Sequence, residues 1–139
     1  MLKKVFTIGI ILFLYTTAIA QKTSQKQVFI LFWKSDCMAC HVAIPQLVHK
    51  IENVDQNKLS IIAVSFDTDS TSYYKAVKEM KMKNFIHQYD FKSGYNNNEL
   101  AKKYNVTKTP TLIYIDSEGN IIAEGNEAFK ILASIKKKE

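Results

Sequence analysis

The only two cysteines of the chain, Cys37 and Cys40, stand three residues apart, between an apolar run typical of a buried strand and a segment with helical spacing. Residues three apart lie on one face of a helix, so the two sulfurs can close a short disulfide. The first sulfur would lie at a helix N-terminus, where unpaired N–H groups and the helix dipole favour an anion. The thiolate is the reactive form of cysteine, so this stretch predicts redox chemistry.

The first twenty residues have the pattern of a secretory signal. Two lysines come first, residues 5–15 are apolar, and Ala18 to Ala20 form a small-residue cleavage pattern. We predict cleavage after Ala20, an exported, periplasmic protein, and one domain over residues 21–139. The alternative is an uncleaved segment that anchors the chain to a membrane, but the apolar run is shorter than the roughly 20 residues that a spanning helix needs.

Export changes what the cysteine pair is expected to do. A disulfide across so short a loop adds little stability, because the entropic gain grows with the length of the closed loop. At 139 residues the chain can also bury a core without such a link. The pair is therefore predicted to serve chemistry, with no cofactor other than the Cys37–Cys40 disulfide itself.

The charge of the chain does not favour a nucleic-acid partner. The sequence has 19 basic and 13 acidic residues, a net charge of +6, and every basic residue is a lysine. Nucleic-acid recognition relies on arginine and on clustered positive charge, whereas these lysines are scattered among Asp and Glu. We expect a solvated surface, and we expect lysines 136–138 in the last turn of the final helix, where cations complement the dipole.

Apolar runs and helix-like segments alternate along the chain. Continuous β-branched and aromatic runs predict buried strands, and apolar residues spaced near 3.6 predict helices. The predicted strands are 28–33, 59–66, 85–89, 111–115 and 121–124. The first predicted helix is 38–53, with a kink at Pro45, and the second is capped by a residue within 67–71 and ends at 82. The third predicted helix follows 96–98 and ends at 104, and the last is capped by Asn126 and ends at 138. This order predicts an α/β fold, with helices on both faces of a mixed sheet that is mostly parallel and ends in an antiparallel hairpin.

Three separated segments resemble the thioredoxin fold, and more closely the exported thiol-disulfide oxidoreductases of the TlpA and ResA type. One is the strand leading through Trp33 into the cysteine pair. The others are Pro45, where the family has a helix-kinking proline, and residues 100–116, which contain Thr109-Pro110. The resemblance covers nearly all of residues 21–139 and implies the thioredoxin fold.

The resemblance implies a thiol-disulfide oxidoreductase, here a reductase, that acts on cysteines of exported proteins. Cys37 would be the nucleophile and Cys40 the resolving cysteine. Pro110 would follow a cis bond facing the pair, where the backbone of Thr109 could pair with an extended substrate segment. Trp33 is expected to pack beside the site and to form part of its binding surface, with core filling alone as the alternative. A membrane-bound thiol reductase is the implied electron donor, and apocytochrome cysteines awaiting haem are among the implied substrates.

The sequence departs from these relatives at two acidic positions. Thioredoxin has a buried acid six residues before its first cysteine, where this chain has Leu31, and ResA-like proteins have Glu three residues after the second, where it has Ala43. Asp36 is therefore the candidate for proton transfer, with a solvent-facing loop acid as the equal alternative. A carboxylate so close to Cys37 would also disfavour the thiolate. These features predict a reducing or intermediate couple rather than a strong oxidant.

Two other functions stay open from the residues. Cys37 to His41 also matches the signature of c-type haem attachment, with His41 as axial ligand. A redox-silent binding module on the same fold is the other alternative, because fold does not dictate function. No metal site is predicted, because zinc would need a fourth ligand from His49 or His87.

Overall fold

The computed structural model describes residues 25–52 and 54–135, so the predicted signal segment and lysines 136–138 lie outside the described residues. The elements follow the predicted alternation of strands and helices. The strands are β1 (Gln27–Trp33), β2 (Leu59–Ser65), β3 (Ile86–Tyr89), β4 (Thr111–Ile115) and β5 (Ile121–Glu124), and the helices are α2 (Met38–Ile51), α3 (Ser70–Glu79), α4 (Glu99–Lys103) and α5 (Gly125–Ser134).

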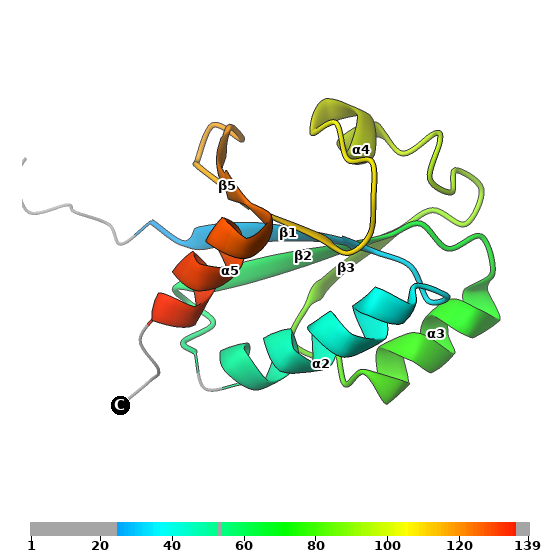
Figure 1. The fold of residues 1–139 in the computed structure, drawn as a ribbon, viewed down its shortest axis with the longest axis horizontal. Helices are drawn as coiled ribbons and strands as arrows, with labels where there is room; N and C mark the ends of the chain where they lie inside the picture. Colours follow the sequence, from blue (N-terminus) through cyan, green and yellow to red (C-terminus); the bar gives the residue numbers. More distant parts are fainter. Residues whose placement is uncertain (1–24, 53, 136–139) are drawn as a thin grey trace, which may run out of the picture.

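The five strands form one mixed sheet in the order β3-β2-β1-β4-β5 (Figure 1). β1 pairs in parallel with β2, and β2 with β3. β4 is antiparallel to both of its neighbours, β1 and β5. The antiparallel part of the sheet therefore includes the pairing of β4 with the central strand as well as the terminal hairpin.

The sheet separates two apolar cores, as alternation along β1 requires. Phe29, Leu31 and Trp33 point into the core that lies under α2, α3 and α5. Ile30 and Phe32 point into a smaller core on the opposite face, which α4 covers. Helices thus lie on both faces of the sheet, as predicted (Figure 1).

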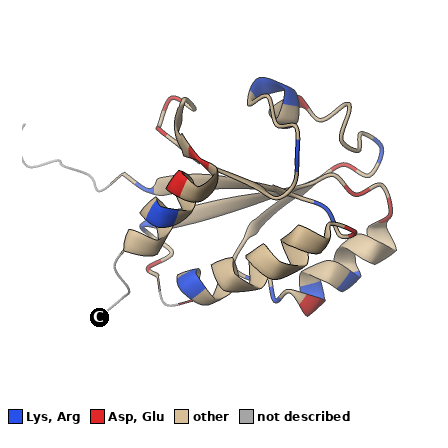
Figure 2. Cartoon of the chain, in the orientation of Figure 1, with Lys and Arg blue, Asp and Glu red and all other residues tan. Residues whose placement is uncertain are grey.

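Charged residues lie mainly on the helices and loops around the sheet (Figure 2). Strands β1 to β4 contain no Lys, Asp or Glu. Positive and negative side chains are interspersed over the described surface, and some form exposed pairs within one helix, such as Lys75 with Glu79. Within residues 25–52 and 54–135, no helix has both the length and the apolar character needed to cross a membrane.

Several predicted helix boundaries are wrong. α2 ends at Ile51 rather than at residue 53, α4 ends at Lys103 rather than at 104, and α5 ends at Ser134, before an extended Ile135, rather than at 138. The helix after β2 ends at Glu79 rather than at residue 82, because Lys81 has a left-handed backbone with φ of 55°, a conformation that stops a helix. The final helix begins at Gly125, so Asn126 lies inside its first turn and does not cap it. β5 leads directly into α5, and Gly125, with φ of 57°, makes the change of direction in a conformation open to glycine.

Asp69 caps α3, and its contribution to stability should depend on pH. Its carboxylate accepts a hydrogen bond from Ser72 N at 2.8 Å. Hydrogen bonds from the side chain and backbone of Ser72 lower the pKa of the Asp69 carboxyl below its usual value. The stabilisation is therefore present above the unfolded-state pKa and is lost as pH falls through the folded-state pKa.

We expect Asp69→Ala to lower the Tm by a few degrees at pH 7 and by less as the pH falls below about 4. Thermal unfolding followed by circular dichroism at a series of pH values measures this difference. A Tm difference that stays constant down to acid pH would contradict the assignment.

Candidate redox site

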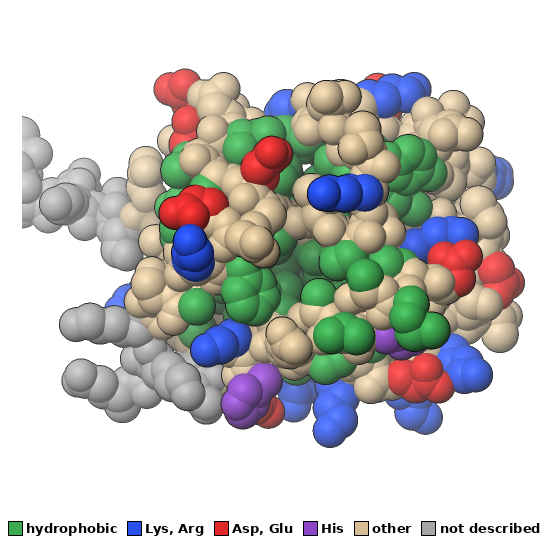
Figure 3. Space-filling model, viewed as in Figure 1, with side chains coloured by type: hydrophobic (Ala, Val, Ile, Leu, Met, Phe, Trp, Pro, Cys, Tyr) green, Lys and Arg blue, Asp and Glu red, His purple; other side chains and the backbone are tan. Residues whose placement is uncertain are grey.

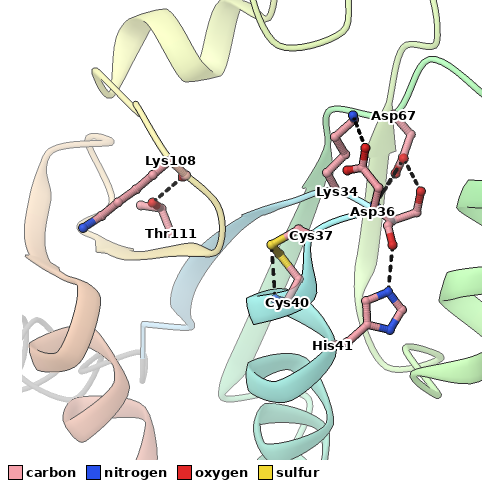
Figure 4. The surroundings of a disulfide bond; sticks show 9 residues. Lys34, Asp36, Cys37, Cys40, His41, Asp67, Lys108 and Thr111 are labelled. Carbon is pink, nitrogen blue, oxygen red and sulfur yellow. Dashed lines mark hydrogen bonds and ion pairs between the residues drawn. A yellow bond between two sulfur atoms is a disulfide. The ribbon is translucent and has the colours of Figure 1, made fainter.

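The cysteine pair lies where β1 ends and α2 begins. Cys37 is the N-cap of α2, with an extended backbone, and its Sγ accepts a hydrogen bond from Cys40 N at 3.1 Å. The carbonyl of Cys37 accepts the hydrogen bonds that begin the helix, from Cys40 N at 2.9 Å and from His41 N at 3.2 Å. The two sulfurs are joined in a disulfide whose Cα atoms are 5.2 Å apart (Figure 4). The predicted placement of the first sulfur at a helix N-terminus is confirmed.

The two sulfurs differ in their exposure to solvent. Cys37 is partly exposed, whereas Cys40 is fully buried. Cys40 lies in the larger core with Ile44 and Leu47 of the same helix. An incoming molecule therefore meets Cys37 first, and Cys40 is shielded from it.

Thr109 and Pro110 lie at the same end of the sheet as the cysteine pair. The register between antiparallel β1 and β4 pairs Phe32 with Thr111, so the segment that precedes β4 adjoins the end of β1. The Thr109–Pro110 bond is cis, and both residues are partly exposed. Figure 4 shows this segment, held by a hydrogen bond of 2.8 Å from Thr111 Oγ1 to the carbonyl of Lys108, across from the disulfide.

An apolar cleft of about 150 Å³ adjoins Pro110 between α2 and α5. Its lining includes Leu31 and Ala43, the two positions at which the resemblance in sequence leads one to expect an acid. Figure 3 shows apolar side chains exposed between these two helices. None of the described lining residues is titratable, so both departures from the family pattern make the same cleft apolar.

The structure buries Trp33 and leaves the side chain of Asp36 exposed. Trp33 is fully buried and packs on Tyr73 of α3 with ring centroids 5.6 Å apart. It cannot contribute to a binding surface, so that prediction is wrong. The side chain of Asp36 is 69% exposed and pairs with Lys34 at 2.6 Å. Figure 4 shows this carboxylate turned toward Lys34.

Asp67, just after β2, is the residue of this region that the sequence did not single out. The sequence pattern offers it as one of several possible caps of the next helix, but Asp69 is the cap, and Asp67 is only 3% exposed. Its carboxylate accepts hydrogen bonds from Ser35 N at 3.1 Å and from Ser35 Oγ at 2.5 Å. In the sequence, the only sign of its role is that it lies in a short polar stretch directly after a buried strand. That pattern does not show which distant residue the Asp67 carboxylate binds.

His41 also contacts Ser35 rather than standing free. Its Nε2 lies 2.7 Å from the carbonyl oxygen of Ser35. Across residues 25–52 and 54–135, the His, Cys, Asp and Glu side chains form no group of three or more that could hold a metal ion. The haem alternative needs both cysteine sulfurs as attachment points, whereas here they are bonded to each other.

Comparison with known proteins agrees with this geometry. A family model described as thioredoxin-like matches residues 25–121. The structure is similar to a C-terminal domain ascribed to a thiol-disulfide oxidoreductase of Bacteroides thetaiotaomicron, with 26% identity, a TM-score of 0.63, and coverage of 84% of this chain and 80% of that one. A comparison with curated proteins found no match.

Two further solved structures share the fold. One is a thiol-disulfide oxidoreductase from Bacteroides fragilis NCTC 9343, with 22% identity, a TM-score of 0.63, and coverage of 81% of this chain and 83% of that one. The other is a secreted disulfide oxidoreductase of Mycobacterium tuberculosis, with 18% identity, a TM-score of 0.58, and coverage of 73% and 69%. The family match spans more than half of the sequence and includes the cysteine pair. The chain belongs to the thioredoxin-like family and carries the Cys-x-x-Cys site of its thiol-disulfide oxidoreductases.

Proposed function

We propose that this protein is an exported reductase that acts on disulfides of other exported proteins through Cys37. One observation carries the proposal: two bonded sulfurs lie at the N-terminus of α2, and only the first of them reaches the surface. The helix N-terminus favours the thiolate, and the thiolate is the nucleophile in disulfide exchange.

In the proposed reaction, the reduced enzyme attacks as the Cys37 thiolate. A bond forms between Cys37 Sγ and one sulfur of the substrate disulfide, and the other substrate sulfur leaves as a thiolate that takes up a proton. Cys40 then attacks Cys37 Sγ, which releases the second substrate thiol and closes the disulfide seen in the structure. Two electrons pass from the enzyme to the substrate. A dithiol donor must then reduce the Cys37–Cys40 bond.

Thr109 and Pro110 are proposed to hold the backbone of the substrate. They precede β4 at the end of the sheet where Cys37 lies, and they are partly exposed. Thr109 offers backbone polar groups that an extended segment can pair with as an added strand. Asp36 keeps the proton-transfer role as a prediction: it is next to Cys37 in sequence, and its ion-pair partner is Lys34.

The reducing direction is supported by what lies around the cysteines. Neither Leu31 nor Ala43 supplies a charge to the adjoining cleft, and the residues between the two cysteines are neutral. A strong oxidant depends on a specially stabilised thiolate, for which these residues offer no cation. We propose a membrane-bound thiol reductase as electron donor. Export is supported by the predicted signal segment and by the secreted relative of the same fold.

Replacing the resolving cysteine should trap the substrates. In Cys40→Ala, Cys37 can still attack, but nothing resolves the mixed disulfide, so covalent adducts should accumulate in the host. Non-reducing gels followed by mass spectrometry would identify the partners. The double variant Cys37→Ala/Cys40→Ala is the matched control and should form none. Adducts at equal yield in both variants, or in neither, would contradict the proposed role of Cys37.

A further inference from the structure

A buried carboxylate fixes the loop that delivers Cys37 to its helix. Asp67 follows β2 and accepts hydrogen bonds from both the backbone N–H and the hydroxyl of Ser35, which lies 32 residues earlier. A third donor, Ser65 Oγ, lies 2.7 Å from the same carboxylate. The Asp67 N–H in turn donates to Ser65 Oγ at 3.0 Å. Ser65 thus holds the Asp67 carboxylate in place on one side, and the carboxylate binds Ser35 on the other.

Ser35 is also held from the helix that follows. His41 Nε2 contacts the Ser35 carbonyl, so all three polar groups of Ser35 are engaged, two by Asp67 and one by His41 (Figure 4). The next turn of the loop closes with a bond of 3.2 Å from Cys37 N to the carbonyl of Lys34. These hydrogen bonds therefore fix the conformation of the loop at Ser35, two residues before Cys37.

We propose that Asp67 is a positioning residue for Cys37. By holding Ser35, it keeps the Cys37 sulfur at the N-cap of α2, where Cys40 N donates to it at 3.1 Å. This inference rests on the proposed function, because a fixed sulfur position matters only if the thiolate is the nucleophile. Asp67 does not act on sulfur itself: its described hydrogen bonds go to Ser35 and Ser65.

Two effects of the carboxylate have opposite signs, which makes the proposal testable. Its negative charge alone would disfavour a thiolate nearby, so neutralising it would make Cys37 more reactive. Its hydrogen bonds to Ser35 favour the thiolate, because they keep the Cys37 sulfur within reach of the Cys40 N–H. Weakening these hydrogen bonds would make Cys37 less reactive. The positioning effect of the hydrogen bonds to Ser35 is larger than the opposing effect of the Asp67 charge on the Cys37 thiolate.

The test uses the pH dependence of alkylation of Cys37 by iodoacetamide in a Cys40→Ala background, which leaves one thiol. Asp67→Asn keeps the size of the side chain but replaces one acceptor by a donor facing the same donors. We expect the rate constant at pH 7 to fall roughly tenfold and the midpoint of the profile to move to higher pH. Ser35→Ala, which removes only the hydroxyl donor, should shift the midpoint in the same direction by less.

Asp69→Asn is the matched control, because it removes an exposed charge two residues away and keeps a capping side chain. It should leave the profile unchanged. Faster alkylation of Asp67→Asn, or a lower Tm with an unchanged midpoint, would overturn the positioning role. If Asp67→Asn does not fold, Ser35→Ala decides between these outcomes. Failure of Cys37 to react near neutral pH with Asp67 intact would instead overturn the proposed function.

Discussion

Cys37→Ala should abolish the catalysed reduction of a protein disulfide, such as that of insulin, by dithiothreitol. The partly exposed sulfur at the N-cap of α2 is the one that a substrate can reach, and Cys40 is fully buried. Cys40 therefore cannot take over the attack. The rate should fall to that of dithiothreitol alone, a loss of at least about a hundredfold in the catalysed term. Turbidity of the reduced insulin chains measures it.

The control for this experiment is a substitution that leaves the site untouched. Ser117→Ala changes an exposed residue in the turn between β4 and β5 and should keep the full rate. Unfolding curves of both variants show whether the loss comes from chemistry or from folding. A Cys37→Ala protein that is folded and reduces insulin at the rate of the unsubstituted protein would refute the mechanism.

The strands and helices were predictable because their signals are local. β1 and β2 are continuous apolar runs that need no partner to be recognised, and the cysteine spacing places both sulfurs on one helix turn. Asn98 was in the stretch expected to cap a short helix, and its side chain accepts from Ala101 N. Each of these features depends on residues within about one helical turn of one another.

The role of Asp67 depends on a contact between distant segments. Nothing within the sequence around Asp67 shows that it will bind Ser35, because that contact exists only once β1 and β2 pair in parallel with Trp33 opposite Ser65. The start of α5 was mispredicted for a local reason. Asn126 is a good capping residue, but β5 leads directly into the helix, so Glu124 holds the N-cap position without a side-chain hydrogen bond and Asn126 lies in the first turn.

Trp33 shows the same limit for a single side chain. Its position one residue before the site-bearing loop was compatible with either a buried or a surface role. The face of the sheet to which it points is covered by α3, whose Tyr73 packs against the indole. That helix comes from a part of the chain that the local pattern does not link to β1. Burial by α3 therefore decided the role of Trp33, and proximity in sequence to Cys37 did not.

Trp33→Ala should lower the free energy of unfolding by about 3–5 kcal/mol, the usual cost of removing a large aromatic side chain from a packed core. The side chain is fully buried in the larger core, so the substitution leaves a cavity between β1 and α3. Urea unfolding followed by circular dichroism measures the loss. The signal must not be tryptophan fluorescence, because Trp33 is the only tryptophan.

Two further variants separate burial from a surface role. Trp33→Phe keeps an aromatic ring and removes the indole N–H, which has no hydrogen-bond partner among the described residues, so it should cost clearly less than Trp33→Ala. Met38→Ala, at a side chain that is 80% exposed beside Cys37, should change the free energy of unfolding by less than about 0.5 kcal/mol. If Trp33→Ala weakened disulfide reduction but left the free energy of unfolding unchanged, the indole would belong to the binding surface after all. Because its ring lies against Tyr73 within the core, we expect the reverse: lost stability, and activity retained wherever the variant remains folded.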